Sequence, residues 1–129
     1  MTKKNIFNLV IAMCIASFAG AQCLSNPTAD LIGPNGMPDG NGNCPYSLEI
    51  CVTVIENDVN LIEFRAGSVS GELDAGNGNT TFPVDGIPLC ITLNLTLDCL
   101  NPSILAIVEG FDNPGGGNGG SCFVESGVV

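Results

Sequence analysis

The feature that most constrains the fold is a strict alternation of apolar and polar residues from Leu89 to Asp98. Aliphatic residues occupy every second position, and the positions between them hold Cys90, Thr92, Asn94, Thr96 and Asp98. A period of two residues is typical of a β-strand with one buried face. The segment 48–56 repeats the pattern, with Leu48, Ile50, Val52 and Val54 on one face. Both segments therefore predict strands that pack against a core on one side.

Shorter apolar runs, separated by Gly, Asn, Asp and Pro, predict further strands at 30–32, 60–66, 80–83, 104–109 and 122–129. No window of a dozen residues after position 21 keeps a helical apolar period free of these breakers. We therefore expect an all-β fold. The arrangement predicted is a single antiparallel β-sandwich, immunoglobulin-like, with about seven short strands and long Gly- and Asn-rich loops.

The stretch 81–86, followed by 93–98 and 101–105, resembles a segment of a cohesin-type or immunoglobulin-like sandwich. Cys99 and Leu100 interrupt the place where such segments keep Asp and Pro close together. The resemblance implies the sandwich fold and assigns no activity.

The first 21 residues have the pattern of a secretory signal peptide. Lys3 and Lys4 precede an apolar run from Ile6 to Phe18, and residues 19–21 read Ala-Gly-Ala. A short basic region, an apolar region and a small-residue cleavage site direct export and are removed afterwards. We expect cleavage after Ala21, which leaves a single domain at 22–129 that is secreted, whether extracellular, periplasmic or at the cell surface. No membrane span is expected in this mature form.

Charge excludes some classes of partner. Of the 3 basic residues only Arg65 lies after position 21, whereas all 13 acidic residues do. The mature chain therefore has a formal charge of −12. An acidic chain lacks the basic surface that binds nucleic acid or an anionic membrane. We therefore expect a protein partner or self-assembly and no nucleic acid.

Six cysteines remain after position 21, and an even number in a short exported chain indicates a disulfide framework. Cys90 and Cys99 bracket the alternating strand and would lie about 30 Å apart, so they are not expected to pair with each other. Cys51 and Cys90 lie on the polar faces of their strands and can bridge if those strands are neighbours. Fifteen connectivities remain open for the set Cys23, Cys44, Cys51, Cys90, Cys99 and Cys122.

Three loops combine Asp or Asn with glycine. Calcium takes six to eight oxygen ligands from carboxylates, amides and carbonyls held by a tightly turning backbone. The same residue types also form turns, because they tolerate positive φ, and the turn interpretation is the favoured one. The candidate calcium ligands are Asp39, Asn41 and Asn43 in the first loop, Asp74, Asn77 and Asn79 in the second, and Asp112 in the third.

Catalysis is not expected. The chain has no histidine, which excludes histidine-dependent nucleophilic sites. Tyr46 is the only Tyr or Trp in the chain, so sugar-stacking platforms are also missing. The favoured function is an exported, non-catalytic binding or cell-surface structural domain without a cofactor. One alternative is a calcium-dependent binding module, and another is a surface subunit that self-assembles through its C-terminal strand, 122–129.

Overall fold

The computed structural model describes residues 3–8, 22–76, 80–112 and 120–129. These residues form eight β-strands, and no helix occurs among them, so none of them forms a helix that could cross a membrane. The strands are β1 (Lys3–Asn8), β2 (Leu24–Gly33), β3 (Asn43–Val54), β4 (Val59–Ala66), β5 (Val69–Asp74), β6 (Leu89–Asp98), β7 (Leu105–Asp112) and β8 (Gly120–Val128). Seven of them lie after residue 21, in agreement with the number expected for the mature domain.

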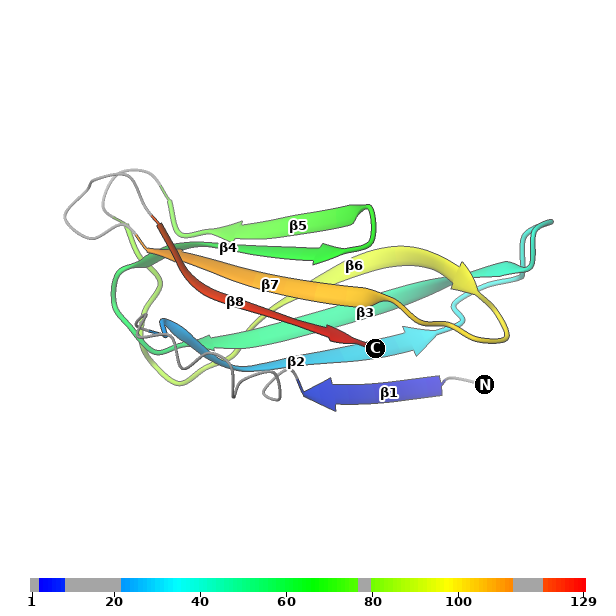
Figure 1. Cartoon of the computed structure of the whole chain (residues 1–129), viewed down its shortest axis with the longest axis horizontal. Coiled ribbons are helices and arrows are strands. Elements are labelled where there is room, and N and C mark those ends of the chain that lie inside the picture. Colours follow the sequence, from blue (N-terminus) through cyan, green and yellow to red (C-terminus); the bar gives the residue numbers. More distant parts are fainter. Residues whose placement is uncertain (1–2, 9–21, 77–79, 113–119) are drawn as a thin grey trace.

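The strands form two four-stranded antiparallel sheets. The first sheet has the order β1-β2-β3-β6 and the second has the order β5-β4-β7-β8. The two sheets lie one over the other, with β1 and β8 on one side and β6 and β5 on the other (Figure 1). The predicted all-β sandwich is therefore confirmed.

The core lies between the sheets, where side chains of alternate residues meet. Both sheets contribute fully buried aliphatic residues, and Phe64 on β4 is the largest side chain among them. On β6 the alternation predicts the structure residue by residue, because Leu93, Leu95 and Leu97 are buried while Thr92 and Asn94 are exposed. The outer face of the first sheet is consequently polar.

The immunoglobulin-like detail of the prediction is not settled by this arrangement. In constant-type immunoglobulin domains the fourth strand belongs to the sheet of the first, second and fifth strands. Here β5, the fourth strand after residue 21, pairs with β4 in the second sheet. The structure therefore shows an antiparallel β-sandwich, and its strand order differs from that of a constant-type immunoglobulin domain.

The sequence patterns missed β5 and wrongly placed a strand at 80–83. A two-residue turn at Gly67 and Ser68 joins β4 to β5, and Gly67 has the positive φ of 59° that such turns require. Gly71 in β5 breaks the apolar alternation. A Cβ atom at Gly71 would lie 2.5 Å from Cδ1 of Ile91 on β6, so glycine allows the two strands to approach closely. Residues 80–83 instead form a loop, in which Phe82 packs against the core and Phe82 N donates a hydrogen bond to Val59 O.

All six cysteines after residue 21 form disulfides. Cys51–Cys90 joins β3 to β6 at directly opposed positions, as their polar-face placement allowed. Cys44–Cys99 joins the start of β3 to the residue that follows β6. Cys23–Cys122 joins the first sheet to the second across 99 residues of sequence. The expected disulfide framework is therefore present, and Cys90 does not pair with Cys99.

Candidate binding sites at the two ends and on the outer face

Three carboxylates meet at one end of the sandwich. Glu56 and Asp58 lie in the connection between β3 and β4, and Asp112 ends β7. Val59 pairs with Asp112 in the β4–β7 register, which brings the preceding Asp58 beside it. Carboxylate oxygens of these three residues lie within 4.8 Å of one another. We call this set the acidic cluster.

The acidic cluster contains a carboxylate oxygen that has no hydrogen-bond partner in the described part of the chain. Oδ1 of Asp58 is buried and accepts no hydrogen bond from the described residues. A buried acceptor without a partner costs about 1–3 kcal/mol, and more when it is charged. Carboxylate oxygens are the ligands that calcium prefers. Ile55 and Val84, which are exposed apolar residues, line an open hollow with Glu56 and Asp58.

Of the seven residues predicted as calcium ligands, only Asp112 belongs to the acidic cluster. Asp74 ends β5, and its carboxylate Oδ1 accepts a hydrogen bond of 2.9 Å from Gly76 N. That bond closes a turn of the kind Asp favours. Asn77 and Asn79 lie outside the described residues.

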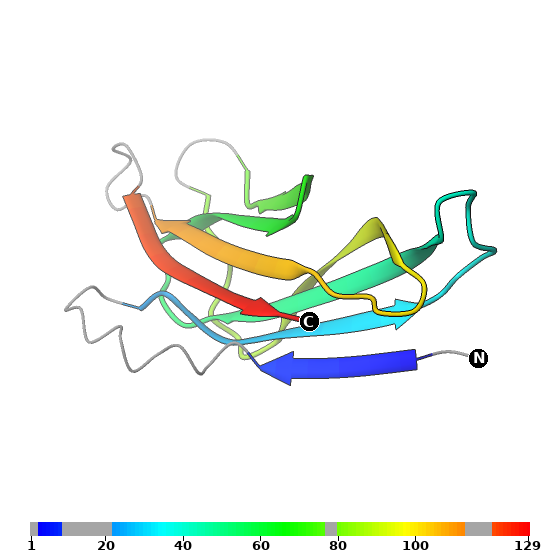
Figure 2. The same ribbon diagram turned by 45° about the vertical axis from the view of Figure 1, so that its right-hand side comes forward.

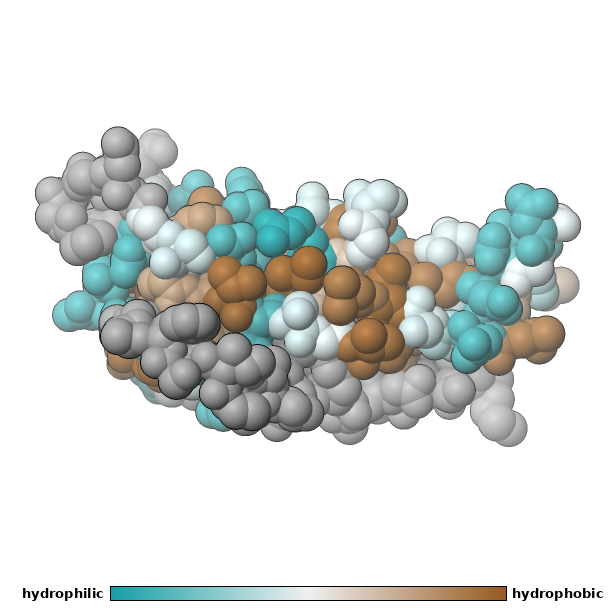
Figure 3. Space-filling model, viewed as in Figure 1, coloured by the Kyte–Doolittle hydropathy of each residue, from teal (hydrophilic) through white to brown (hydrophobic). Residues whose placement is uncertain are grey.

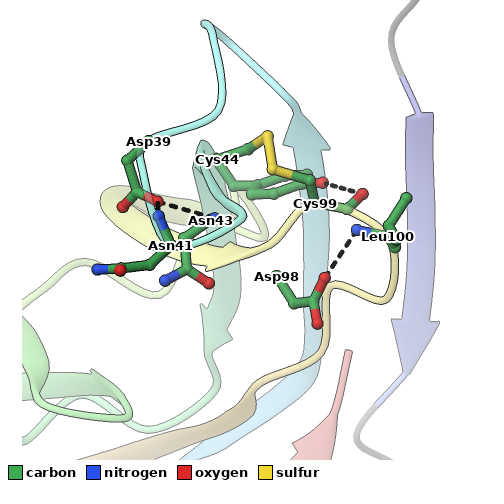
Figure 4. The surroundings of a disulfide bond; sticks show 8 residues. Asp39, Asn41, Asn43, Cys44, Asp98, Cys99 and Leu100 are labelled. Atoms are coloured by element: carbon green, nitrogen blue, oxygen red, sulfur yellow. Dashed lines mark hydrogen bonds between the residues drawn. A yellow bond between two sulfur atoms is a disulfide. The ribbon is translucent and has the colours of Figure 1, made fainter.

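The first Asp/Asn/Gly loop lies at the opposite end of the sandwich from the acidic cluster (Figures 1 and 2). Asp39 turns its carboxylate onto its own loop, where Oδ1 accepts hydrogen bonds from the backbone N–H of Asn41 at 2.8 Å and of Asn43 at 3.0 Å (Figure 4). Asp39 therefore forms a turn here. Because this loop and Asp112 lie at opposite ends of the sandwich, their side chains cannot contribute to the same site.

The same end is fastened by the Cys44–Cys99 disulfide. Tyr46 donates a hydrogen bond from its hydroxyl to the carbonyl oxygen of Cys99, and Leu100 N donates to Oδ1 of Asp98 at 2.8 Å (Figure 4). Cys99 N also donates to Gly42 O. The Cys99–Gly42 bond joins the β2–β3 loop to the β6–β7 loop, and the side chain of Leu100 remains exposed.

A second grouping of possible metal ligands lies on the outer face of the first sheet. Glu49 approaches Cys51 and Cys90 there. Both sulfur atoms belong to a disulfide, whereas a metal requires the thiolate form. This grouping is therefore a structural bridge.

The outer face of the second sheet carries an apolar surface that the sequence patterns did not reveal. On β7 and β8, Leu105, Val124 and Val128 are 49%, 56% and 63% exposed. The register places Leu105 opposite Val128, and Ile107 opposite Ser126 between the two valines. We call Leu105, Ile107, Val124 and Val128 the β7–β8 patch. A signal existed in the unbroken apolar run 104–108, which places aliphatic residues on both faces of one strand.

Arg65 is held by acidic neighbours on β4 and β7. Its guanidinium lies 3.2 Å from Oε1 of Glu109 and 3.9 Å from Oε2 of Glu63. The β4–β7 register places Glu63 opposite Glu109, so the arginine offsets the repulsion between two facing carboxylates. The only cation after residue 21 thus has a structural role.

Comparison with family models, with curated proteins and with solved structures finds no match to this chain.

Proposed function

We propose that the chain is exported and works as a non-catalytic domain that binds a protein partner or forms part of a cell-surface structure. Three disulfides in a small all-β domain indicate an oxidising compartment. The observation that carries the binding proposal is the β7–β8 patch, because exposed apolar groups that cluster on one face mark interaction sites. In Figure 3 hydrophobic residues gather over β7 and β8.

The patch has the composition of a protein-binding surface. Four aliphatic residues form its centre, and the Arg65–Glu109 ion pair borders it. An apolar centre with a charged rim is the usual anatomy of an interface between proteins. The other sheet presents a polar outer face, so the two faces of the sandwich differ in what they can bind.

Site-specific photo-cross-linking of the exported protein in its own cells tests the binding proposal. A photoreactive residue replaces Val124 in the patch or, as a matched control, Thr92 on the exposed face of β6. We expect one adduct of defined mass at position 124 and none at position 92. The adduct should disappear when Val128 is also changed to Asp. Equal labelling at both positions, or none at either, contradicts the proposal.

A second candidate function is calcium-dependent binding at the acidic cluster. The buried, unsatisfied Oδ1 of Asp58 favours it. A site with a Kd of about 1 mM would stabilise the fold by about 1.4 kcal/mol in about 10 mM calcium, by linkage. A calcium-dependent rise in melting temperature that Asp58→Asn abolishes and Glu72→Gln preserves would support this candidate. Glu72 is a suitable control because it is an exposed acid on β5, the strand at the far edge of the second sheet.

The position of β8 at a sheet edge supports the alternative in which the protein self-assembles through its C-terminal strand. The segment Gly120–Val128 is the edge strand of the second sheet, so one side of its backbone faces outward. The Cys23–Cys122 disulfide and the pairing with β7 hold it in its own molecule. Association through this exposed edge is therefore compatible with the fold, whereas donation of the strand to another copy would require these contacts to separate.

A further inference from the structure

The first sheet is completed by residues that belong to the proposed signal peptide. β1 (Lys3–Asn8) pairs with β2 over six residues, from Lys3 opposite Gly33 to Asn8 opposite Thr28. Figures 1 and 2 show β1 as the outermost strand of this sheet. Cleavage after Ala21 would remove β1, so this inference depends on the export step of the proposed function. The backbone groups of β2 that face β1 would then lose their partners.

The edge exposed in this way has defined limits. At one end of β2 the ladder is interrupted by a bulge between Ser25 and Thr28, where Asn26 has a φ of 50° and Pro27 lacks an N–H. At the other end Gly33 is followed by Pro34. Strand pairing on this edge is therefore confined to Thr28–Gly33, which is the stretch that β1 covers.

One acidic group lies on the outer face of this edge, and a second lies on β8, a strand that contacts β1. Asp30 is near the centre of the paired stretch and points to the outer face, next to Glu49 of β3 in the register. Glu125 lies on β8, which is the strand of the second sheet that contacts β1. Glu125 has the same parity on β8 as the buried Phe123, so it turns toward the interior. Its Oε2 is buried and has no hydrogen-bond partner among the residues that the structure describes.

We propose that the processed protein uses the Thr28–Gly33 edge to accept an extended, lysine- or arginine-bearing strand of a partner protein. Strand addition supplies backbone hydrogen bonds, and charge complementarity selects the partner. The strand that fills the edge in the full chain carries the only two lysines of the sequence, Lys3 and Lys4. Before cleavage, β1 covers this edge.

A second copy of the chain is a poor occupant. Each processed copy has a formal charge of −12, and its single cation, Arg65, already contacts Glu109 and Glu63. Pairing of two β2 strands centred on Asp30 would place two aspartates opposite each other, and like charges in opposed positions destabilise a sheet. A basic partner strand meets no such repulsion.

The test uses protein purified after export and a synthetic peptide, Lys-Lys-Asn-Ile-Phe-Asn, as the probe. Amide hydrogen exchange followed by NMR should show protection of amides within 28–33 on peptide addition, with no change on the β8 edge. A peptide with both lysines replaced by glutamate should bind at least about ten-fold more weakly. Asp30→Asn should weaken binding of the lysine peptide several-fold, because Asp30 lies within the paired stretch, while Glu72→Gln on the distant β5 edge should leave it unchanged.

Three results would overturn the proposal: protection on β8 in place of β2, equal binding of the lysine and glutamate peptides, or amides within 28–33 already protected in a dimer of the processed protein. The mass of the exported protein tests the export step separately. An exported protein that keeps residues 1–21 overturns the processing on which the proposed function relies. A processed protein whose 28–33 amides gain no protection overturns the strand-acceptor proposal alone.

Discussion

Cys51 and Cys90 lie directly opposite each other on β3 and β6, and their disulfide crosses the outer face of the first sheet. Cys23–Cys122 has a different position, because Cys23 is completely buried and the bridge connects the two sheets. These two bridges therefore stabilise the domain in different ways, and substitution of each pair can separate the two effects.

Replacing Cys51 and Cys90 together by alanine should lower the free energy of unfolding by about 2–4 kcal/mol, because the unfolded chain gains freedom. Replacing Cys23 and Cys122 should cost more, since that bridge closes a longer loop and fills buried space. Denaturant unfolding of the two double variants measures the difference. Equal losses, or a larger loss for the Cys51–Cys90 pair, would contradict this ranking.

Gly110 on β7 should not tolerate a side chain. A Cβ atom there would lie 2.7 Å from Cδ1 of Leu24, which is fully buried, and 3.2 Å from Sγ of the bridged Cys23. Gly110→Ala should therefore destabilise the fold by about 1–3 kcal/mol through overpacking. Gly40→Ala is the control, because nothing lies within 4 Å of a Cβ atom at that position. The melting temperature should fall for the first variant and stay within a degree or two, or rise slightly, for the second.

Glu125 should make stability depend on pH. In the full chain, in which β1 contacts β8, burial raises the pKa of the Glu125 carboxyl above its ordinary value. The folded chain then keeps a proton that the unfolded chain loses, so the free energy of unfolding falls as the pH rises from the ordinary pKa through the folded pKa. Glu125→Gln does not titrate and should remove this part of the slope, making the variant comparatively more stable at neutral pH than in acid. Denaturant midpoints measured across that interval check it, with Glu72→Gln as the control. A slope that Glu125→Gln leaves unchanged would assign the effect to another group.

Asp39 should stabilise the β2–β3 loop without any metal. Its Oδ1 accepts two backbone hydrogen bonds, from Asn41 and Asn43, so Asp39→Ala should cost about 0.5–2 kcal/mol. Asp39→Asn retains an oxygen acceptor and should recover part of the loss, and Asn41→Ala should have little effect. Thermal unfolding with and without calcium provides the measurement. A calcium response that Asp39→Ala abolished would instead return this loop to the metal interpretation.

Strands and their buried residues can be predicted from the sequence wherever the alternation of apolar and polar residues is unbroken. Strand 89–98 was predicted with its ends, and Leu93 and Leu95 are buried as expected. Strand β5 could not be predicted in this way, because Gly71 interrupts its apolar alternation. Glycine is needed there since a side chain would collide with Ile91 of the other sheet. That constraint comes from tertiary structure and leaves no periodic trace.

The acidic cluster shows a second limit. Asp112 was a candidate because of its glycine-rich neighbours, whereas Glu56 and Asp58 have no such context. They meet Asp112 through the pairing of β4 with β7, which places Val59 opposite Asp112. Three carboxylates from distant segments can be grouped only when the order of strands in the sheet is known.

We propose above that the chain is exported, processed after residue 21 and oxidised. The intact mass of the exported protein, measured before and after reduction, tests it most directly. We expect a chain that begins at Gln22 and gains six hydrogens on reduction, as three disulfides require. A chain that keeps residues 1–21, or cysteines that are already free thiols before reduction, would contradict it.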